Sequence, residues 1–185
     1  TAGLAGCGGG GNASGGSGSA KDVAQIGNQT YKTLKAAIEA TTSEASTIQL
    51  LSNIDIKNSN ISIPSNSNIT LDLNGHEILA ANSDSSGIIV YGALTLEDST
   101  DTNKDGTGQG KIYNDSDSNY VYGSFDKTLI QVYGGTFTME SGLVDAVLDN
   151  PSSNGQFAIG VYNDSADATV TINGGKIRAG WYAVA

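Results

Sequence analysis

The chain has 185 residues and a formal net charge of -10, with 25 glycines and only 15% charged residues. This length fits one domain, and the acidic balance repels phosphate backbones, which excludes nucleic acid as an expected partner. The sequence holds no run of 18 or more apolar residues, so it contains no complete transmembrane helix.

The first 20 residues are predicted to tether the protein to a membrane. Leu4-Ala5-Gly6-Cys7 resembles a bacterial lipobox, and its small residues are typical of a signal-peptide cleavage region. The resemblance implies that residues 1–6 end a lipoprotein signal peptide and that Cys7, the only cysteine, carries the lipid. Residues 7–20 are rich in glycine and serine and predict a flexible linker. A chance cysteine in a Gly/Ala-rich segment is the alternative.

A short helix is predicted near the start of the following domain, over residues 31–40. Leu34, Ala37 and Ile38 fall on one helical face. Thr30 is the expected N-cap, because its hydroxyl can accept a hydrogen bond from the first turn.

Short strands follow, with apolar residues at every second position and glycines between them. The Asn74-Gly75 pair ends one of them in a predicted turn. Aligned by these patterns, the strands form repeating units, which predicts a solenoid. The aligned sets are Leu71/Leu73, Leu94/Leu96, Phe137/Met139 and Val170/Ile172; Ile112, Val144 and Ile177; and Ile89, Ile130 and Ile159.

The segments AQIGNQTYKTLKAAIEA, TIQLLSNI, NISIP and NITLDLNGHEI resemble the start of right-handed parallel β-helix domains, the pectate-lyase-like domains of bacterial surface proteins. The resemblance implies an all-β fold, a right-handed parallel β-helix over residues 21–185 with a short N-terminal capping α-helix. Such a cap is physically reasonable, because the first turn otherwise exposes a core and a strand edge. The last unit lacks a polar cap, so we expect a domain truncated at its C-terminus.

One loop has the pattern of a calcium site. Asp101, Asn103 and Asp105, followed by Gly106, match the opening of a calcium-binding loop, in which alternating oxygens converge on the ion. The twelfth position is Ile112 where an EF-hand has glutamate, and no predicted helices flank the loop. A solvated surface loop is the alternative, and Asp98 is a further candidate ligand.

Two glutamates are the candidate catalytic pair. If the aligned apolar residues point inward, Glu97 and Glu140 stack outside in one column with Asn74 and Asn173. Neighbouring strands lie about 4.8 Å apart, close to the roughly 5 Å between the carboxyl groups of a retaining glycosidase. Arg178 is the candidate proton acceptor of a lyase. Two solvated glutamates on a strand face are the alternative.

Three tyrosines are the candidate ligand-binding residues. Tyr91, Tyr133 and Tyr162 occupy one repeat position and predict an aromatic ladder that stacks on sugars or merely on itself. We therefore expect a lipid-anchored bacterial protein on the extracellular face of the cell envelope, acting as a non-enzymatic scaffold or adhesin-like carbohydrate-binding module, with no cofactor and with calcium as the alternative. A polysaccharide lyase or glycoside hydrolase is the alternative, and a purely structural stalk is a third.

Overall fold

The computed structural model describes residues 21–57, 59, 61–81, 87–114, 128–147, 157–162, 167–180 and 182–185. The predicted lipidation site, Cys7, lies outside the described residues, as does the whole of the predicted linker. The lipoprotein assignment therefore stays a prediction.

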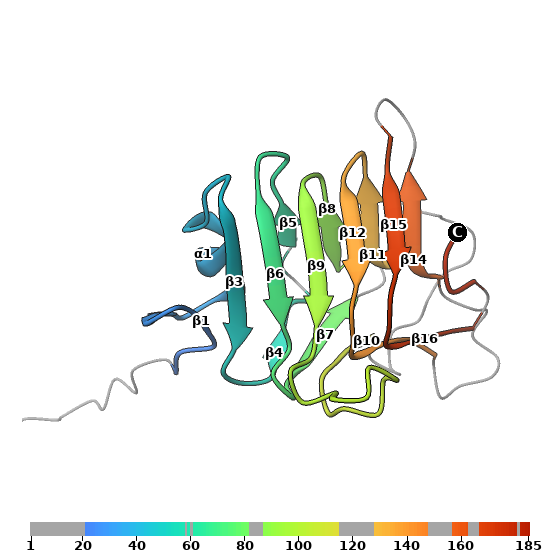
Figure 1. Ribbon diagram of the computed structural model, residues 1–185, viewed down its shortest axis with the longest axis horizontal. Helices are drawn as coiled ribbons and strands as arrows, with labels where there is room; N and C mark the ends of the chain where they lie inside the picture. The colour runs from blue at the N-terminus through green and yellow to red at the C-terminus, as the bar shows by residue number, and fades with distance from the viewer. Residues whose placement is uncertain are drawn as a thin grey trace, which may run out of the picture.

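The described strands form three sheets (Figure 1). The seven-stranded sheet has the order β15 (Thr169–Ile172), β12 (Thr136–Met139), β9 (Ala93–Glu97), β6 (Asn68–Asp72), β3 (Ala45–Leu50), β1 (Ala24–Ile26) and β2 (Gln29–Tyr31). The five-stranded sheet has the order β16 (Lys176–Ala179), β13 (Leu143–Ala146), β10 (Lys111–Asn114), β7 (Glu77–Ala81) and β4 (Ile54–Asp55). The four-stranded sheet has the order β14 (Phe157–Tyr162), β11 (Thr128–Tyr133), β8 (Ile88–Val90) and β5 (Ile61–Ile63).

The predicted fold class, a single right-handed parallel β-helix, is wrong as stated. The structure shows a mostly β fold in which parallel sheets are stacked side by side, together with one short helix among the described residues. The seven-stranded sheet is not wholly parallel, because β1 pairs antiparallel with both β2 and β3. Period-two patterns and glycine turns specify strands and their ends, but they do not specify how separate sheets associate.

The helix is shorter than predicted and has a different cap. Helix α1 spans Leu34–Glu39, and its N-cap is Thr33, whose side chain accepts a hydrogen bond from the Ala36 amide. Thr30 and Tyr31 belong instead to β2, which forms a hairpin with β1 across Gly27 at φ 55°. The predicted apolar face is confirmed, since Leu34, Ala37 and Ile38 are buried in the core. Figure 1 places α1 at the N-terminal end of the sheets.

The inward residues of the strands form one hydrophobic core. Three of the aligned pairs are confirmed, since Phe137 and Met139 of β12 lie in register with the Leu94/Leu96 pair of β9 and the Val170/Ile172 pair of β15. The aligned Ile112, Val144 and Ile177 are also confirmed as neighbours.

Two of the predicted alignments are wrong in register. In β6 the residues that pair with Leu94 and Leu96 are Ile69 and Leu71, so the Leu71/Leu73 alignment is two residues too late. A two-residue slip keeps every side chain on the same face, so the apolar pattern does not detect it. In β8 the partner of Ile130 is Ile88 and not Ile89.

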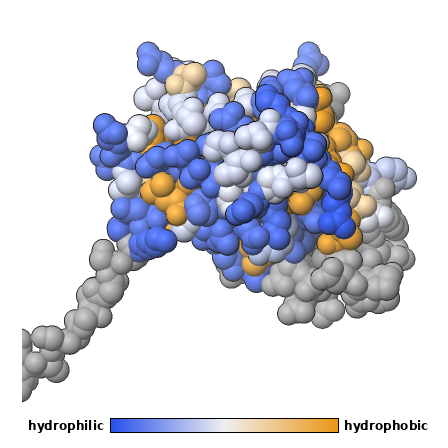
Figure 2. Space-filling model, turned by 60° about the horizontal axis from the view of Figure 1, so that its bottom comes forward, coloured by the Kyte–Doolittle hydropathy of each residue, from blue (hydrophilic) through white to orange (hydrophobic). Residues whose placement is uncertain are grey.

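The exterior differs between the middle of the molecule and its ends. Figure 2 shows a mainly hydrophilic surface with hydrophobic residues gathered toward each end. Of the four exposed large hydrophobic residues among those described, Ile172, Tyr182 and Val184 lie in the last part of the chain, and Tyr91 lies in the middle. In the part of the chain that the structure describes, no helix is long and apolar enough to cross a membrane.

Candidate functional site

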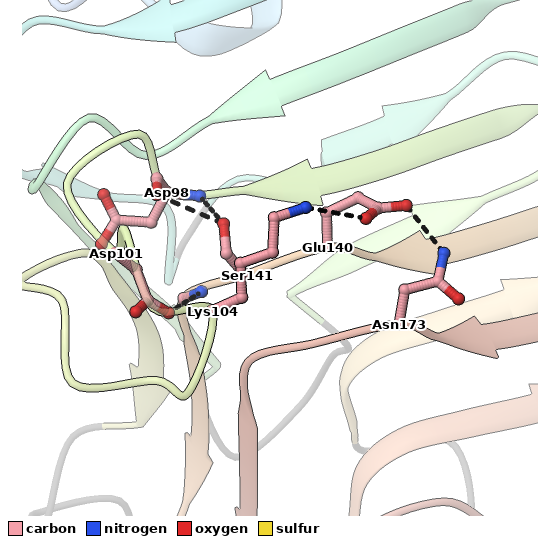
Figure 3. A network of polar contacts seen from close by, with 7 residues as sticks. Asp98, Asp101, Lys104, Glu140, Ser141 and Asn173 are labelled. Atoms are coloured by element: carbon pink, nitrogen blue, oxygen red, sulfur yellow. Dashed lines mark hydrogen bonds and ion pairs between the residues drawn. The ribbon is translucent and has the colours of Figure 1, made fainter.

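The centre of the candidate site is the connection between β9 and β10, which begins at Asp98. The Asp98 carboxylate is buried and accepts hydrogen bonds from the β6–β7 turn and from its own loop. Its Oδ1 accepts from the Gly75 amide at 2.9 Å and the Thr100 hydroxyl at 2.8 Å, and its Oδ2 accepts from the Gly110 amide at 2.7 Å. Ser141 adds a second link, since its Oγ accepts from the Asp98 amide at 2.7 Å (Figure 3). Asp98 thus joins three chain connections.

A second buried carboxylate, that of Asp101, folds the loop back on itself. Its Oδ2 accepts hydrogen bonds from the amides of Gly106 and Gly142, both at 2.9 Å, and its Oδ1 accepts from the Asp105 amide at 3.3 Å. Burial by itself raises the pKa of this carboxyl, but the donors from Gly142, Gly106 and Asp105 outweigh burial and hold the pKa below its usual value. Asp101 is therefore an anion stabilised by backbone amides.

These contacts bear on the predicted calcium loop. The carboxylate oxygens of Asp101 already accept from backbone amides, and Asp105 accepts from the amide and hydroxyl of Thr107, at 3.0 Å and 2.5 Å. Asn103 is exposed. Among the described residues, no group of three or more His, Cys, Asp or Glu side chains is placed to hold a metal ion. Calcium binding stays a prediction, and a calorimetric titration that detects no heat at millimolar calcium would contradict it.

Beyond the buried aspartates, the same loop presents Lys104 to the sheet face. Lys104 has a left-handed backbone, with φ 55°, and its carbonyl accepts from the Gly175 amide at 2.7 Å. Its Nζ lies 3.3 Å from Glu140 Oε2, while Asn173 Nδ2 donates to Glu140 Oε1 at 2.7 Å (Figure 3). These hydrogen bonds, from Asn173 first and Lys104 second, lower the pKa of Glu140.

Glu97, the other predicted catalytic glutamate, has the opposite electrostatics. Partial burial and, after it, the negative charges of Asp72 and Glu140 raise the pKa of Glu97, while Lys104 opposes them. The Glu97 carboxylate makes no hydrogen bond to another described residue. Its partner in register is Asp72 and not the predicted Asn74, which follows from the two-residue slip in β6. The structure therefore brings Glu97 and Glu140 side by side, with Asp72 next to them.

The third predicted catalytic residue lies elsewhere. Arg178 is on β16 of the five-stranded sheet, where its Nη1 donates to Asp145 Oδ2 at 2.8 Å. Asp145 is its partner in register on β13. Arg178 is therefore on a different sheet from Glu97 and Glu140, and its positive charge is already paired.

The three predicted tyrosines lie in one row at the ends of β8, β11 and β14. The ring centroids of Tyr91 and Tyr133 are 5.5 Å apart in an edge-to-face arrangement, and those of Tyr133 and Tyr162 are 5.4 Å apart and stacked. Tyr91, which is 41% exposed, ends the row. Tyr133 and Tyr162 thus cover one face of each other, and Tyr91 is the member of the row that is most exposed.

Sequence reasoning missed the roles of Asp98 and Ser141. A signal for Asp98 was present, because it continues the alternation of Leu94 and Leu96 and therefore points inward. A buried carboxylate must be paired or hydrogen-bonded, so its position alone indicates a network. No comparable signal identifies Ser141, which bonds Asp98 across 43 positions of sequence.

Comparisons with known proteins supply no relative. No protein-family model, curated protein or solved structure matches the chain.

Proposed function

We propose that this protein is a lipid-anchored bacterial surface protein that binds carbohydrate without catalysing a reaction. The observation that carries the proposal is the tyrosine row, Tyr91, Tyr133 and Tyr162, formed by three neighbouring strands. Aromatic rings pack well against the CH faces of sugar rings and carry a hydroxyl for hydrogen bonding. Tyr91, at the exposed end of the row, is the proposed first contact.

The charges around the candidate catalytic residues also support binding over reaction. Glu140 is held by Lys104 and Asn173, and Arg178 is held by Asp145. A lyase needs a basic residue free to accept a proton near the substrate, and the Arg178 guanidinium is engaged on another sheet.

Binding is tested by affinity electrophoresis of the purified chain in gels that contain soluble polysaccharides. We expect Tyr91→Ala to lose retardation and Tyr182→Ala, a change at an exposed tyrosine outside the row, to keep it. A wild-type chain that no polysaccharide retards contradicts the proposal. The membrane anchor is tested separately, since Cys7→Ser should abolish incorporation of a labelled fatty acid in cells.

A glycoside hydrolase is the second candidate, and one observation favours it. Glu97 and Glu140 are adjacent carboxyl groups whose pKa values are shifted in opposite directions. This is the arrangement of an acid and a nucleophile on one site. Release of reducing ends from a polysaccharide that stops in Glu97→Gln and in Glu140→Gln would establish hydrolysis and overturn the non-catalytic proposal.

A further inference from the structure

A column of threonines crosses the outer face of the seven-stranded sheet. The side chains are in register from β3 to β15, and each faces the same way because the pairs are parallel and unshifted. The column consists of Thr47, Thr70, Thr95, Thr138 and Thr171. Strands lie about 4.8 Å apart, so the hydroxyl groups repeat at that interval along a line that runs across the strands.

These hydroxyl groups have unused hydrogen-bonding capacity. Within the described residues none of the five makes a side-chain hydrogen bond, although Thr47 and Thr171 are exposed and the other three are half-buried. The next outward column behaves differently, because many of its side chains bond each other. Gln25 donates to Gln49 at 2.7 Å, Gln49 donates to Asp72 at 2.9 Å, and Asn173 donates to Glu140 at 2.7 Å.

The regular spacing and the charge together limit what fits this face. The threonine column carries no charge, and the protein as a whole carries -10, which repels polyanions. A partner that follows the column needs hydrogen-bonding groups repeated along one line and no negative charge. The backbone amides of the inner strands are used in the sheet, so a peptide cannot add as a further strand over this face.

We infer that the threonine column is a binding surface for an extended, uncharged polysaccharide that lies across the strands. The inference rests on the proposed carbohydrate binding and names its ligand class and a second contact surface. Sugar hydroxyl groups donate to and accept from the threonine hydroxyls, while threonine methyl groups pack against sugar CH groups. Each contact is weak, but the contacts repeat along one polysaccharide chain, so together they strengthen its binding.

The test compares Thr95→Val/Thr138→Val with wild type on a soluble neutral β-glucan, a galactomannan and polygalacturonate. Valine keeps the branched shape and the strand preference of threonine and replaces the hydroxyl with a methyl group. We expect about tenfold weaker binding to a neutral polysaccharide, because two hydrogen bonds are lost. Thr102→Val, an exposed loop change, is the matched control and should bind as wild type does. Thr95→Ser/Thr138→Ser keeps the hydroxyls and should retain most of the affinity.

Three outcomes overturn the inference, and they are distinguishable. Binding that Tyr91→Ala removes but Thr95→Val/Thr138→Val leaves unchanged would contradict the threonine surface and leave the proposed function standing. Binding to polygalacturonate alone would contradict the uncharged ligand. A wild-type chain that binds none of the three would contradict the proposed function itself. Urea unfolding of each variant checks that the comparison is made between folded proteins.

Discussion

Glu97 and Asp98 are neighbours in sequence and carry the same charge, yet the fold gives them different surroundings. Asp98 points inward and is only 1% exposed, with amide and hydroxyl donors on both carboxylate oxygens. Glu97 points outward between the carboxyl groups of Asp72 and Glu140. The difference teaches that two adjacent acids on one strand can have opposite surroundings, because successive side chains point to opposite faces of the sheet.

The largest expected effect is on the buried side. Asp98→Asn replaces one carboxylate oxygen with an NH2 group, which cannot accept the hydrogen bonds of that oxygen: either those from Gly75 and Thr100 or that from Gly110. Because hydrogen bonds to charged groups contribute about 1.5–3 kcal/mol each, we expect a loss of roughly 3 kcal/mol in the free energy of unfolding. Urea unfolding at pH 7 measures this loss. Glu97→Gln is the matched control one residue away. Equal losses of unfolding free energy in the two variants would contradict the difference between the buried Asp98 and the outward Glu97.

Asp101→Asn should be the next largest, and its effect should depend on pH. The folded-state pKa of Asp101 is lowered, so its ionised form contributes stability above the unfolded aspartate pKa of about 3.9. That contribution is lost as the pH falls through the lowered folded-state value. We expect a loss of about 2 kcal/mol at pH 7 that shrinks toward zero in strong acid. Unfolding curves of both proteins from pH 7 to pH 2 measure it, and a difference that does not change with pH would contradict this account.

Glu97→Gln should change the free energy of unfolding only slightly, and toward greater stability at pH 7. The folded-state pKa of Glu97 is raised, so the stability of its protonated form is complete below about pH 4.3 and is lost as the pH rises through the raised value. Glutamine does not ionise, so the variant should match or exceed wild type at pH 7, by less than about 1 kcal/mol because the site is partly solvated. Glu140→Gln is the contrasting variant, because its pKa is lowered, and it should be the less stable of the two at pH 7.

Lys104 should show the smallest effect. Its left-handed backbone costs a lysine about 1–2 kcal/mol. Lys104→Gly removes that cost but also removes an exposed ion pair worth about 0.2–1 kcal/mol and adds freedom to the unfolded chain. We expect a net change within about 0.5 kcal/mol in urea unfolding. Lys104→Val, a β-branched residue that tolerates this backbone poorly, should be clearly less stable than Lys104→Gly, and the reverse order would contradict the strain.

Much of the local structure can be predicted from the sequence, and particular residues show why the rest cannot. Phe137 and Met139 were placed correctly because apolar alternation reports which face a residue occupies. The Leu71/Leu73 error arose because the β6–β7 connection is longer than that between β12 and β13. A shift of two residues leaves the apolar alternation unchanged, so the pattern does not reveal it. Such patterns do not predict how the sheets associate, because that association depends on contacts between residues that are distant in sequence.

The candidate site, too, can be predicted from the sequence only in part. The closeness of Glu97 and Glu140 followed from strand alignment, since one spacing rule governs all parallel pairs. The loop of Asp101, Asn103 and Asp105 resembles a calcium-binding loop, because calcium loops and turns closed by backbone amides use the same oxygen-bearing residues. Calcium binding stays a prediction. The amides that reach Asp101 could not be predicted from the sequence, because the Gly142 amide comes from 41 positions away.

The comparison is tested most directly by following the carboxyl carbons of Glu97, Glu140 and Asp101 by NMR during one acid titration. We predict that Glu97 titrates above the ordinary glutamate value, while Glu140 and Asp101 titrate below their ordinary values. Three midpoints at the ordinary values, or a Glu97 midpoint below that of Glu140, would contradict the different surroundings that the structure gives to these three acids.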